Sequence, residues 1–139
     1  MKNLITAITS KITTGPSNFY NDVGGRVYYR RPPQGARTLP DCIISIVVDS
    51  PDNVFAKRGE DVSIQFSLFS ESDSITEMDS MYSDLKTLFD DVKLTVTSST
   101  MIIMKRERLV AMNEIVITTN GEQDCDFWAV DYSITLQTT

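Results

Sequence analysis

The chain has 139 residues, of which 41% are hydrophobic and 9% aromatic, and its formal net charge is −6. This length supports one hydrophobic core, so we expect residues 1–139 to form a single domain. The sequence contains no histidine, which excludes Ser-His and Cys-His nucleophile pairs and the commonest metal ligand.

Charge is distributed unevenly along the chain. Residues 1–40 carry six basic side chains and one acidic side chain (+5), whereas residues 41–139 carry seven basic and eighteen acidic ones (−11). This division suits head-to-tail contact between identical subunits, and it also fits an ordinary solvated surface. The sequence has no run of eighteen apolar residues and no signal-peptide pattern, so we expect a soluble, non-secreted protein with no membrane segment.

The N-terminal segment is predicted to form a short helix followed by a loop. Four apolar residues share one helical face: Leu4, Ile5, Ile8 and Ile12. This spacing predicts a helix over residues 2–13 that Gly15-Pro16 ends. Residues 14–25 have the composition of a loop. Its aromatic pair, Phe19 and Tyr20, caps the core or touches a partner, and we favour the core.

Two strands and two loops are predicted next. Residues 26–30 alternate enough for a short strand, and the prolines and glycine of residues 31–37 then form an arginine-containing turn. Residues 42–48 are nearly all apolar, which suits a central strand covered on both faces. Residues 50–60 contain turn residues and are predicted to be a loop longer than a tight turn needs, of the kind that is often functional or mobile.

Residues 61–92 carry the clearest signals of the chain. Residues 62–68 place large apolar side chains at every second position, which predicts a half-buried strand. The segment after it has an apolar stripe at helical spacing, formed by Ile75, Met78, Met81, Tyr82, Leu85, Leu88, Phe89 and Val92. Ser74 and Glu77 have the spacing of a capping box at its start. This helix must bury its stripe on the sheet that contains the preceding strand.

The C-terminal third is predicted to be β-structure. Residues 93–97 suit a short strand, residues 101–112 a strand or a bent pair of strands, and residues 115–117 another strand. Asn120-Gly121 is a strong turn signal, and residues 127–136 alternate as a long closing strand. The order predicts an α+β fold, with a mostly antiparallel β-sheet and two α-helices packed on one face.

Motifs that carry chemistry are missing from the sequence. It has no glycine-rich phosphate loop, no CxxC pair and no nucleophile elbow. Two carboxylate pairs, Asp90-Asp91 and Asp124/Asp126, lack further ligands at useful spacing and are interpreted as exposed charge. Cys42 and Cys125 are interpreted as small buried hydrophobes in a reducing compartment. We therefore expect no catalytic residues, no cofactor, no metal and no enzyme activity.

Three basic clusters are candidate interface residues, and the predicted loop of residues 50–60 adds one aromatic residue. These candidates are Arg30, Arg31 and Arg37; Lys57 and Arg58, with Phe55 beside them; and Lys105, Arg106 and Arg108. Interface salt bridges, solvated loops and direct phosphate contact remain alternatives, although the acidic net charge opposes binding to a nucleic-acid duplex.

The order and spacing of these elements resemble the tail terminator, or tail completion, proteins of long-tailed bacteriophages. The matching segments are Tyr28 or Tyr29, Pro32-Pro33-Gln34-Gly35-Ala36, Pro40 with Ile43-Ile44, the strand Val62 to Ser70, the helix Leu85 to Val92, and Tyr132-Ser133-Ile134. The resemblance covers most of the chain. This sequence departs from the family pattern at Asp41, where an apolar or aromatic residue often follows the proline, and in a longer segment after the helix.

The resemblance implies a structural role in a virion. Such proteins form rings, typically hexamers, that cap the head-proximal end of a finished tail tube and offer a docking face to the head connector. The implied partners are copies of the chain itself, the tail tube protein, and a head connector or head-closure protein. DNA would pass through the ring without sequence-specific binding. The implied location is the tail or neck of a virion assembled in the host cytoplasm.

Two other interpretations remain open. The first is another ring protein of the phage neck, such as a head-closure protein, which shares the assembly logic and meets different neighbours. The second is a small ligand-binding module, which the lack of histidine and of a convergent polar cluster disfavours.

Overall fold

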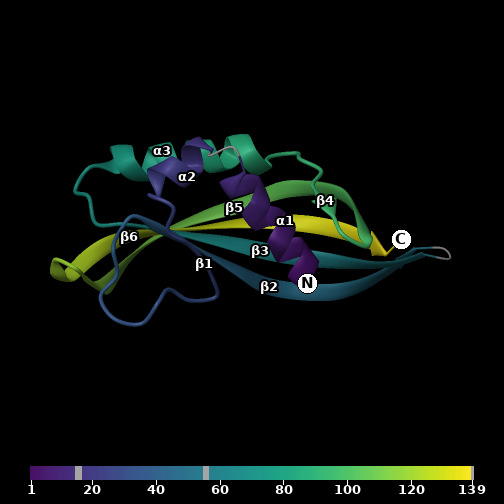
Figure 1. Cartoon of the computed structure of the whole chain (residues 1–139), viewed down its shortest axis with the longest axis horizontal. Helices are drawn as coiled ribbons and strands as arrows, with labels where there is room; N and C mark the ends of the chain where they lie inside the picture. Colours follow the sequence, from purple (N-terminus) through teal and green to yellow (C-terminus); the bar gives the residue numbers. More distant parts are fainter. Residues whose placement is uncertain (15–16, 55–56, 139) are drawn as a thin grey trace.

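The computed structural model describes residues 1–14, 17–54 and 57–138, with side chains except at 52–54, 57 and 138. The elements are α1 (Lys2–Thr13), α2 (Asn18–Asp22), β1 (Val27–Tyr29), β2 (Asp41–Val54), β3 (Lys57–Ser70), α3 (Ile75–Phe89), β4 (Thr95–Val96), β5 (Ser99–Thr118) and β6 (Gly121–Thr138). The strands form one sheet in the order β1-β2-β3-β6-β5-β4. Only the β1–β2 pair is parallel. The helices lie over one face of the sheet (Figure 1), so the α+β prediction is confirmed.

The short helix α2 is absent from the prediction, which placed a loop over residues 14–25. The Ser17 hydroxyl caps this helix by accepting a hydrogen bond of 3.1 Å from the Tyr20 amide. With five residues, α2 is too short to show helical periodicity in the sequence. Phe19 is fully buried in the core, as expected, and it ties α2 to the sheet.

The main core lies between the helices and the sheet. Helix α3 contributes its buried stripe of Met78, Met81, Leu85 and Phe89, and α1 contributes Leu4, Ile8 and Ile12. The ring of Phe66 on β3 stacks on Phe89 with centroids 5.1 Å apart, and it meets Tyr132 on β6 edge to face. The prediction that α3 packs on the strand at residues 62–68 is confirmed.

The start of α3 differs from the prediction in two ways. Ser74 caps the helix, accepting a bond from the Thr76 amide, but Glu77 accepts a bond of 2.6 Å from the Ser70 hydroxyl rather than returning to Ser74. The Ser74 amide donates instead to the Ser72 hydroxyl. Ile75 is 64% exposed and does not belong to the buried stripe. Helical side chains lean toward the N-terminus, so the first residue of α3 points past the helix start.

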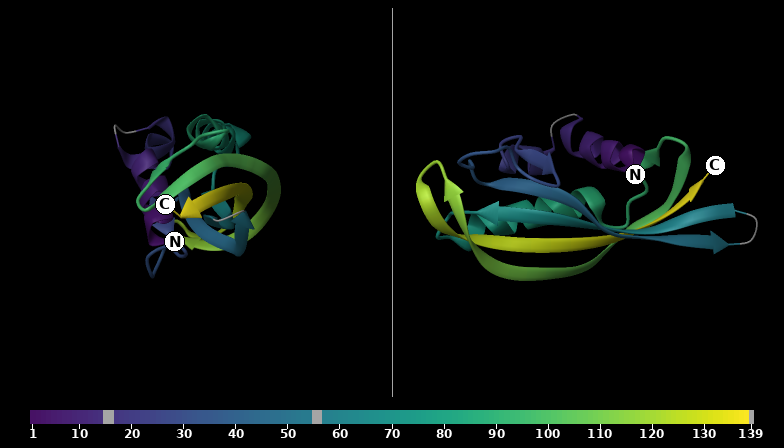
Figure 2. Two further views of the ribbon diagram at one scale, coloured as in Figure 1. Left: turned by 90° about the vertical axis from the view of Figure 1, so that its right-hand side faces the viewer. Right: turned by 90° about the horizontal axis from the view of Figure 1, so that it is seen from below.

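The prediction of a loop over residues 50–60 is wrong. Strands β2 and β3 pair from Asp41 with Phe69 to Val54 with Lys57, with one register shift between Ile46 and Val48, so residues 50–54 and 57–60 extend a long hairpin. Pro51 is tolerated because β1 covers β2 only at residues 42–44, which leaves the outer edge of β2 free beyond them. Pairing of β3 with β6 ends at Gly59, and the hairpin projects beyond it at one end of the molecule (Figure 2).

Strand β2 is covered on both faces over only part of its length. Cys42, Ile43 and Ile44 are buried, whereas Val47 and Val48 are exposed, contrary to the prediction for residues 42–48. A register shift between Ile46 and Val48 interrupts the alternation at this point. The apolar run in the sequence therefore covers a buried segment and an exposed edge segment.

The strands after α3 are longer than the sequence suggests. Residues 101–112 and 115–117 belong to one strand, β5, which register shifts interrupt between Met101 and Met104 and between Arg106 and Arg108. The turn at Asn120-Gly121 is confirmed, and Gly121 adopts a φ of 92° that favours glycine. The alternation of β6 is also confirmed, since its even-numbered residues from Val130 to Leu136 are buried in the main core.

A second, smaller core lies on the sheet face opposite the helices. It consists of Leu39, Ile43, Phe69, Val116 and Cys125, with Phe127 packed against them. The backbone of Arg37 joins this region to the end of β5, donating to the Ile117 carbonyl and accepting from the Thr119 amide, each at 3.0 Å. The residues before β2 thus reach across to β5, and the sheet curls on itself (Figure 2). The two cysteines are buried in different cores, as expected of structural residues.

Candidate assembly surfaces

Arg37, one of the nine candidate interface residues, is held within the fold. Its guanidinium binds both carboxylate oxygens of Asp41 at 2.8–3.1 Å and lies 4.2 Å from the centre of the Phe69 ring. Asp41 is 1% exposed, and burial raises the pKa of its carboxyl although the Arg37 charge acts in the opposite direction. This pair anchors the Pro-rich turn against the second core.

Arg106 also has an internal partner set, at the C-terminal end of α3. Its guanidinium binds the Asp90 carboxylate at 3.2 Å and donates a bond of 2.6 Å to the Tyr82 hydroxyl. The Tyr132 hydroxyl donates to the same carboxylate at 2.6 Å. The interpretation of Asp90 as exposed charge is therefore wrong, because the sheet brings Arg106 and the Tyr132 hydroxyl to the end of α3. Burial, followed by the bond to Asp90, raises the pKa of Tyr132.

Arg108 and its neighbours lie on β5 where the strand is irregular. Arg108 pairs across the sheet with Asp131 at 2.7 Å, and Glu107 accepts a bond from the Ser133 hydroxyl. Lys105 is exposed. The bulge therefore separates the side chains of the Lys105–Arg108 cluster. Arg106 binds Asp90 at the end of α3, whereas Arg108 binds Asp131 on the opposite face of the sheet.

Four of the candidate residues are exposed cations with no ion pair among the described residues: Arg30, Arg31, Arg58 and Lys105. Arg30 and Arg31 follow β1, where the Arg30 amide donates to the Ile44 carbonyl and holds the turn on the edge of β2. Arg58 lies near the tip of the β2–β3 hairpin. Phe55 lies outside the described residues, and the side chain of Lys57 is likewise outside them.

A hollow of about 300 Å³ lies beside the basic turn. Its lining residues come from the first half of α1 and from the end of β1: Met1, Lys2, Ile5, Thr6 and Tyr29. Tyr29 is 46% exposed, and the exposed Arg30 and Arg31 follow it directly. The hollow thus has apolar lining residues and one lining cation, Lys2, and Arg30 and Arg31 directly follow Tyr29 in the sequence. This chemistry suits contact with an acidic, partly apolar partner surface.

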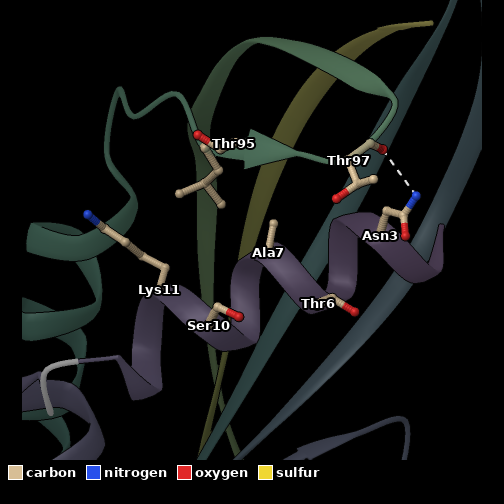
Figure 3. A pocket seen from close by; sticks show the side chains of 8 residues that line it. Asn3, Thr6, Ala7, Ser10, Lys11, Thr95 and Thr97 are labelled. Carbon is tan, nitrogen blue, oxygen red and sulfur yellow. Dashed lines mark hydrogen bonds between the residues drawn. The ribbon is translucent and has the colours of Figure 1, made fainter.

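A second hollow, of about 380 Å³, separates the other side of α1 from β4 (Figure 3). Its lining is rich in hydroxyl groups, from Thr6, Ser10, Thr95 and Thr97, and the Asn3 amide donates to the Thr97 carbonyl at 3.1 Å. Lys11 is the one titratable side chain that lines it. The lining therefore holds no acid–base pair of the kind that catalysis requires.

Two exposed isoleucines mark the end of the β5–β6 hairpin. Ile115 is 65% exposed and Ile117 66% exposed, and both lie on the face of β5 that points away from the second core. Their cross-strand partners on β6 are the exposed acids Asp124 and Glu122. The strand at residues 115–117 is predicted by the sequence but the exposure of its isoleucines is not, because alternation alone does not say which face a helix covers.

A carboxyl pair links α2 to α3. The pKa of Asp22 is raised to about 7, first by burial and then by a hydrogen bond and charge repulsion with Asp84. One oxygen of Asp22 is buried without a hydrogen-bond partner among the described residues. The Asp22 carboxyl therefore takes up a proton as the pH falls through about 7.

Two kinds of feature are absent from the described residues. Across residues 1–14, 17–54 and 57–138, no three His, Cys, Asp or Glu side chains come together as a metal site would require. Within the same ranges, no helix is long and apolar enough to span a membrane. What the molecule presents is a set of charged and apolar surfaces.

Comparison with known proteins supports a shared fold. No protein-family model and no curated protein matches the sequence. Among solved structures, a chain of the virion of a native gene transfer agent particle superposes with a TM-score of 0.71 at 10% sequence identity. The match covers 96% of this chain and 94% of that chain. The two chains therefore share one architecture over almost their entire lengths.

Proposed function

We propose that this protein is a structural component of a tailed, phage-like virion and has no enzymatic role. The observation that supports this proposal is the fold shared with a chain of a gene transfer agent virion, over 96% of one chain and 94% of the other. One fold can carry out many functions, so a specific role depends on the surfaces of this subunit.

Within the virion, the proposed role is that of a tail terminator. Copies of the chain form a ring, hexameric as the resemblance implies, on the head-proximal end of the tail tube. The ring stops tube polymerisation and presents its other face to the head connector. This assignment combines the shared fold with the motif order from Pro32-Pro33 to Tyr132-Ser133-Ile134.

The surfaces suit a ring made by head-to-tail contacts. The cations Arg30 and Arg31 lie beside β1, whereas exposed acids and isoleucines gather at the end of the β5–β6 hairpin. Two different patches on one subunit make heterologous contacts, and such contacts close into a ring when the rotation between subunits permits. The net charge of −6 also favours passage of DNA through the ring without adhesion.

A second candidate is a head-closure protein of the phage neck. Such a protein would also assemble into a ring, and the fold shared with a virion chain is compatible with this role. The two candidates differ in what their loss does to tails. Without a terminator, tube polymerisation has no stop, whereas without a head-closure protein, tails of normal length fail to join heads.

Electron microscopy of particles assembled without this protein tests the proposal. We expect tails longer than those of the parent and detached from heads, and a plasmid-borne copy of the gene should restore normal length. Tails of normal length that stay unjoined would assign the protein to head closure. Normal, joined particles would overturn both candidates.

A further inference from the structure

Two exposed surfaces of this subunit have matching chemistry. The first, the hairpin ridge, consists of Ile115, Ile117, Glu122 and Asp124, which share one face of the β5–β6 hairpin as directly paired residues. The second, the N-terminal hollow, has Met1, Ile5 and Tyr29 in its lining. Lys2 also lines it, and the exposed Arg30 and Arg31 directly follow Tyr29 in the sequence.

The hairpin ridge is unusual among the exposed surfaces of the molecule. Its isoleucines are the two most exposed large hydrophobic residues that the structure describes, at 65% and 66%. Each is paired across the hairpin with a carboxylate, so the ridge places two apolar side chains on β5 beside two negative charges on β6. Exposed apolar groups with a polar rim are a mark of interaction sites.

The N-terminal hollow offers the complementary arrangement. Its volume is about 300 Å³, Lys2 lines it, and two exposed cations, Arg30 and Arg31, directly follow its lining residue Tyr29 in the sequence. Isoleucine side chains would cover Ile5, Met1 and the Tyr29 ring, while the flanking carboxylates would face Lys2, Arg30 and Arg31. Opposite charges around an apolar contact supply the orientation and the association rate of an interface.

We infer that the hairpin ridge of one subunit docks in the N-terminal hollow of a second copy of this chain. The inference rests on the proposed function in one respect only, namely that the partner is another copy of the chain. The ridge and the hollow are both exposed in the isolated subunit and lie in different parts of it, with the hairpin at one end of the long axis (Figure 1). The contact is therefore heterologous, and its repetition generates a ring or a filament.

Disulfide capture tests this contact directly. In the double variant Tyr29→Cys with Ile117→Cys, each subunit offers one thiol to each of its neighbours. With a mild thiol oxidant at high protein concentration, we expect a ladder of covalent oligomers. The native Cys42 and Cys125 are buried, so the parent protein should form none. Each single variant should stop at dimers.

A matched control uses an equally exposed isoleucine outside the ridge. Ile75 on α3 is 64% exposed, so the variant Tyr29→Cys with Ile75→Cys presents as accessible a thiol pair. We expect no ladder from it. Equal ladders from both double variants would show random collision and would overturn the inference, as would no ladder from Tyr29→Cys with Ile117→Cys in free subunits and in assembled particles.

A charge exchange supplies an independent test. Glu122→Lys with Asp124→Lys should weaken self-association at least tenfold, and so should Arg30→Glu with Arg31→Glu, measured by sedimentation across protein concentrations. The protein that carries all four substitutions should recover most of the parent affinity, because each interface again pairs opposite charges. Asp73→Lys with Asp79→Lys, which changes net charge equally at exposed sites, should have little effect.

The outcomes separate this inference from the proposed function. Failure of the four-substitution protein to recover affinity would overturn the ridge-to-hollow contact and leave the virion role untouched. A captured ladder and a recovered affinity, combined with normal particles in the absence of the protein, would retain the contact and overturn the tail-terminator role.

Discussion

The hydroxyl of Tyr132 donates a hydrogen bond of 2.6 Å to the carboxylate of Asp90 and so joins the middle of β6 to the end of α3. Arg106 on β5 binds the same carboxylate at 3.2 Å. Asp90 lies where a helix dipole disfavours negative charge. The cation and the phenol provide the compensation, and the carboxylate connects three elements around the main core.

Substitutions at the two ends of the Tyr132–Asp90 hydrogen bond should lower the free energy of unfolding by different amounts. Tyr132→Phe removes one bond to a carboxylate that keeps Arg106, and we expect a loss of about 1.5–3 kcal/mol in the free energy of unfolding. Asp90→Ala should cost more, because it leaves the buried Tyr132 hydroxyl without this partner. Denaturant unfolding measures both losses, as shifts of the unfolding midpoint at an unchanged dependence of the free energy on denaturant concentration. Equal losses would contradict the asymmetry.

The packing of α3 on β3 predicts a large cost for truncation. Leu85→Ala and Phe66→Ala each remove a fully buried side chain, and each should lower the free energy of unfolding by about 2–5 kcal/mol. Ile75→Ala on the same helix is the matched control and should change it by less than about 0.5 kcal/mol. A large effect at Ile75 in urea denaturation would place that residue in the core after all.

The turn before β2 contains Arg37, which is largely covered, and the exposed Arg30 and Arg31. Substitution of Arg37 and of Arg30 should have different effects on stability. Arg37→Ala leaves the Asp41 charge buried without its bidentate partner, so we expect a loss of about 3–5 kcal/mol. Arg30→Ala should stay within about 0.5 kcal/mol. Thermal unfolding of both variants at one pH compares them. Near-parent stability for Arg37→Ala would show that the pair does not hold the turn.

The Asp22–Asp84 pair predicts a pH-dependent stability. The pKa of Asp22 in the folded protein is raised from 3.8 to about 7, so the folded state holds a proton that the unfolded state has released between these values. Its contribution is therefore fully present below about pH 4 and is lost as pH rises toward 7. Asp22→Asn should flatten this part of the stability profile, measured by urea unfolding from pH 4 to pH 8.

Asp84→Asn is the companion variant for that measurement. It removes the neighbouring charge but not the burial of Asp22, which is the larger cause of the raised pKa. We therefore expect a pH dependence between those of the parent and Asp22→Asn. Identical profiles for the parent and Asp22→Asn would exclude this carboxyl as the source.

The tip of the β2–β3 hairpin is expected to contact a neighbouring subunit or the tail tube. Lys57→Glu with Arg58→Glu should leave the unfolding midpoint unchanged and weaken ring or tail binding, with a smaller salt dependence. Pelleting with purified tail tubes at several ionic strengths measures this. Binding equal to the parent at every ionic strength would leave the basic turn at Arg30 and Arg31 as the better contact.

Local patterns in the sequence determine the elements that depend on neighbours along the chain. The alternation of residues 62–68, the stripe from Met78 to Phe89 and the Asn120-Gly121 turn all predict the observed structure, because side-chain direction in a strand or helix repeats with a fixed period. The α+β class follows from the order of these elements. Burial of Phe19 and of both cysteines agrees with the apolar character of these residue types.

Tertiary structure alone decides which faces are covered and which charges are paired. A β-bulge between Arg106 and Arg108 lets Arg106 bind Asp90 at the end of α3 and Arg108 bind Asp131 on β6. No local spacing in the sequence encodes that bulge. The curl that joins Arg37 to Thr119 likewise depends on sheet twist accumulated over several strands. Exposure of Ile115 and Ile117 is also decided by the tertiary structure, because their strand runs past the helices that cover the rest of its face.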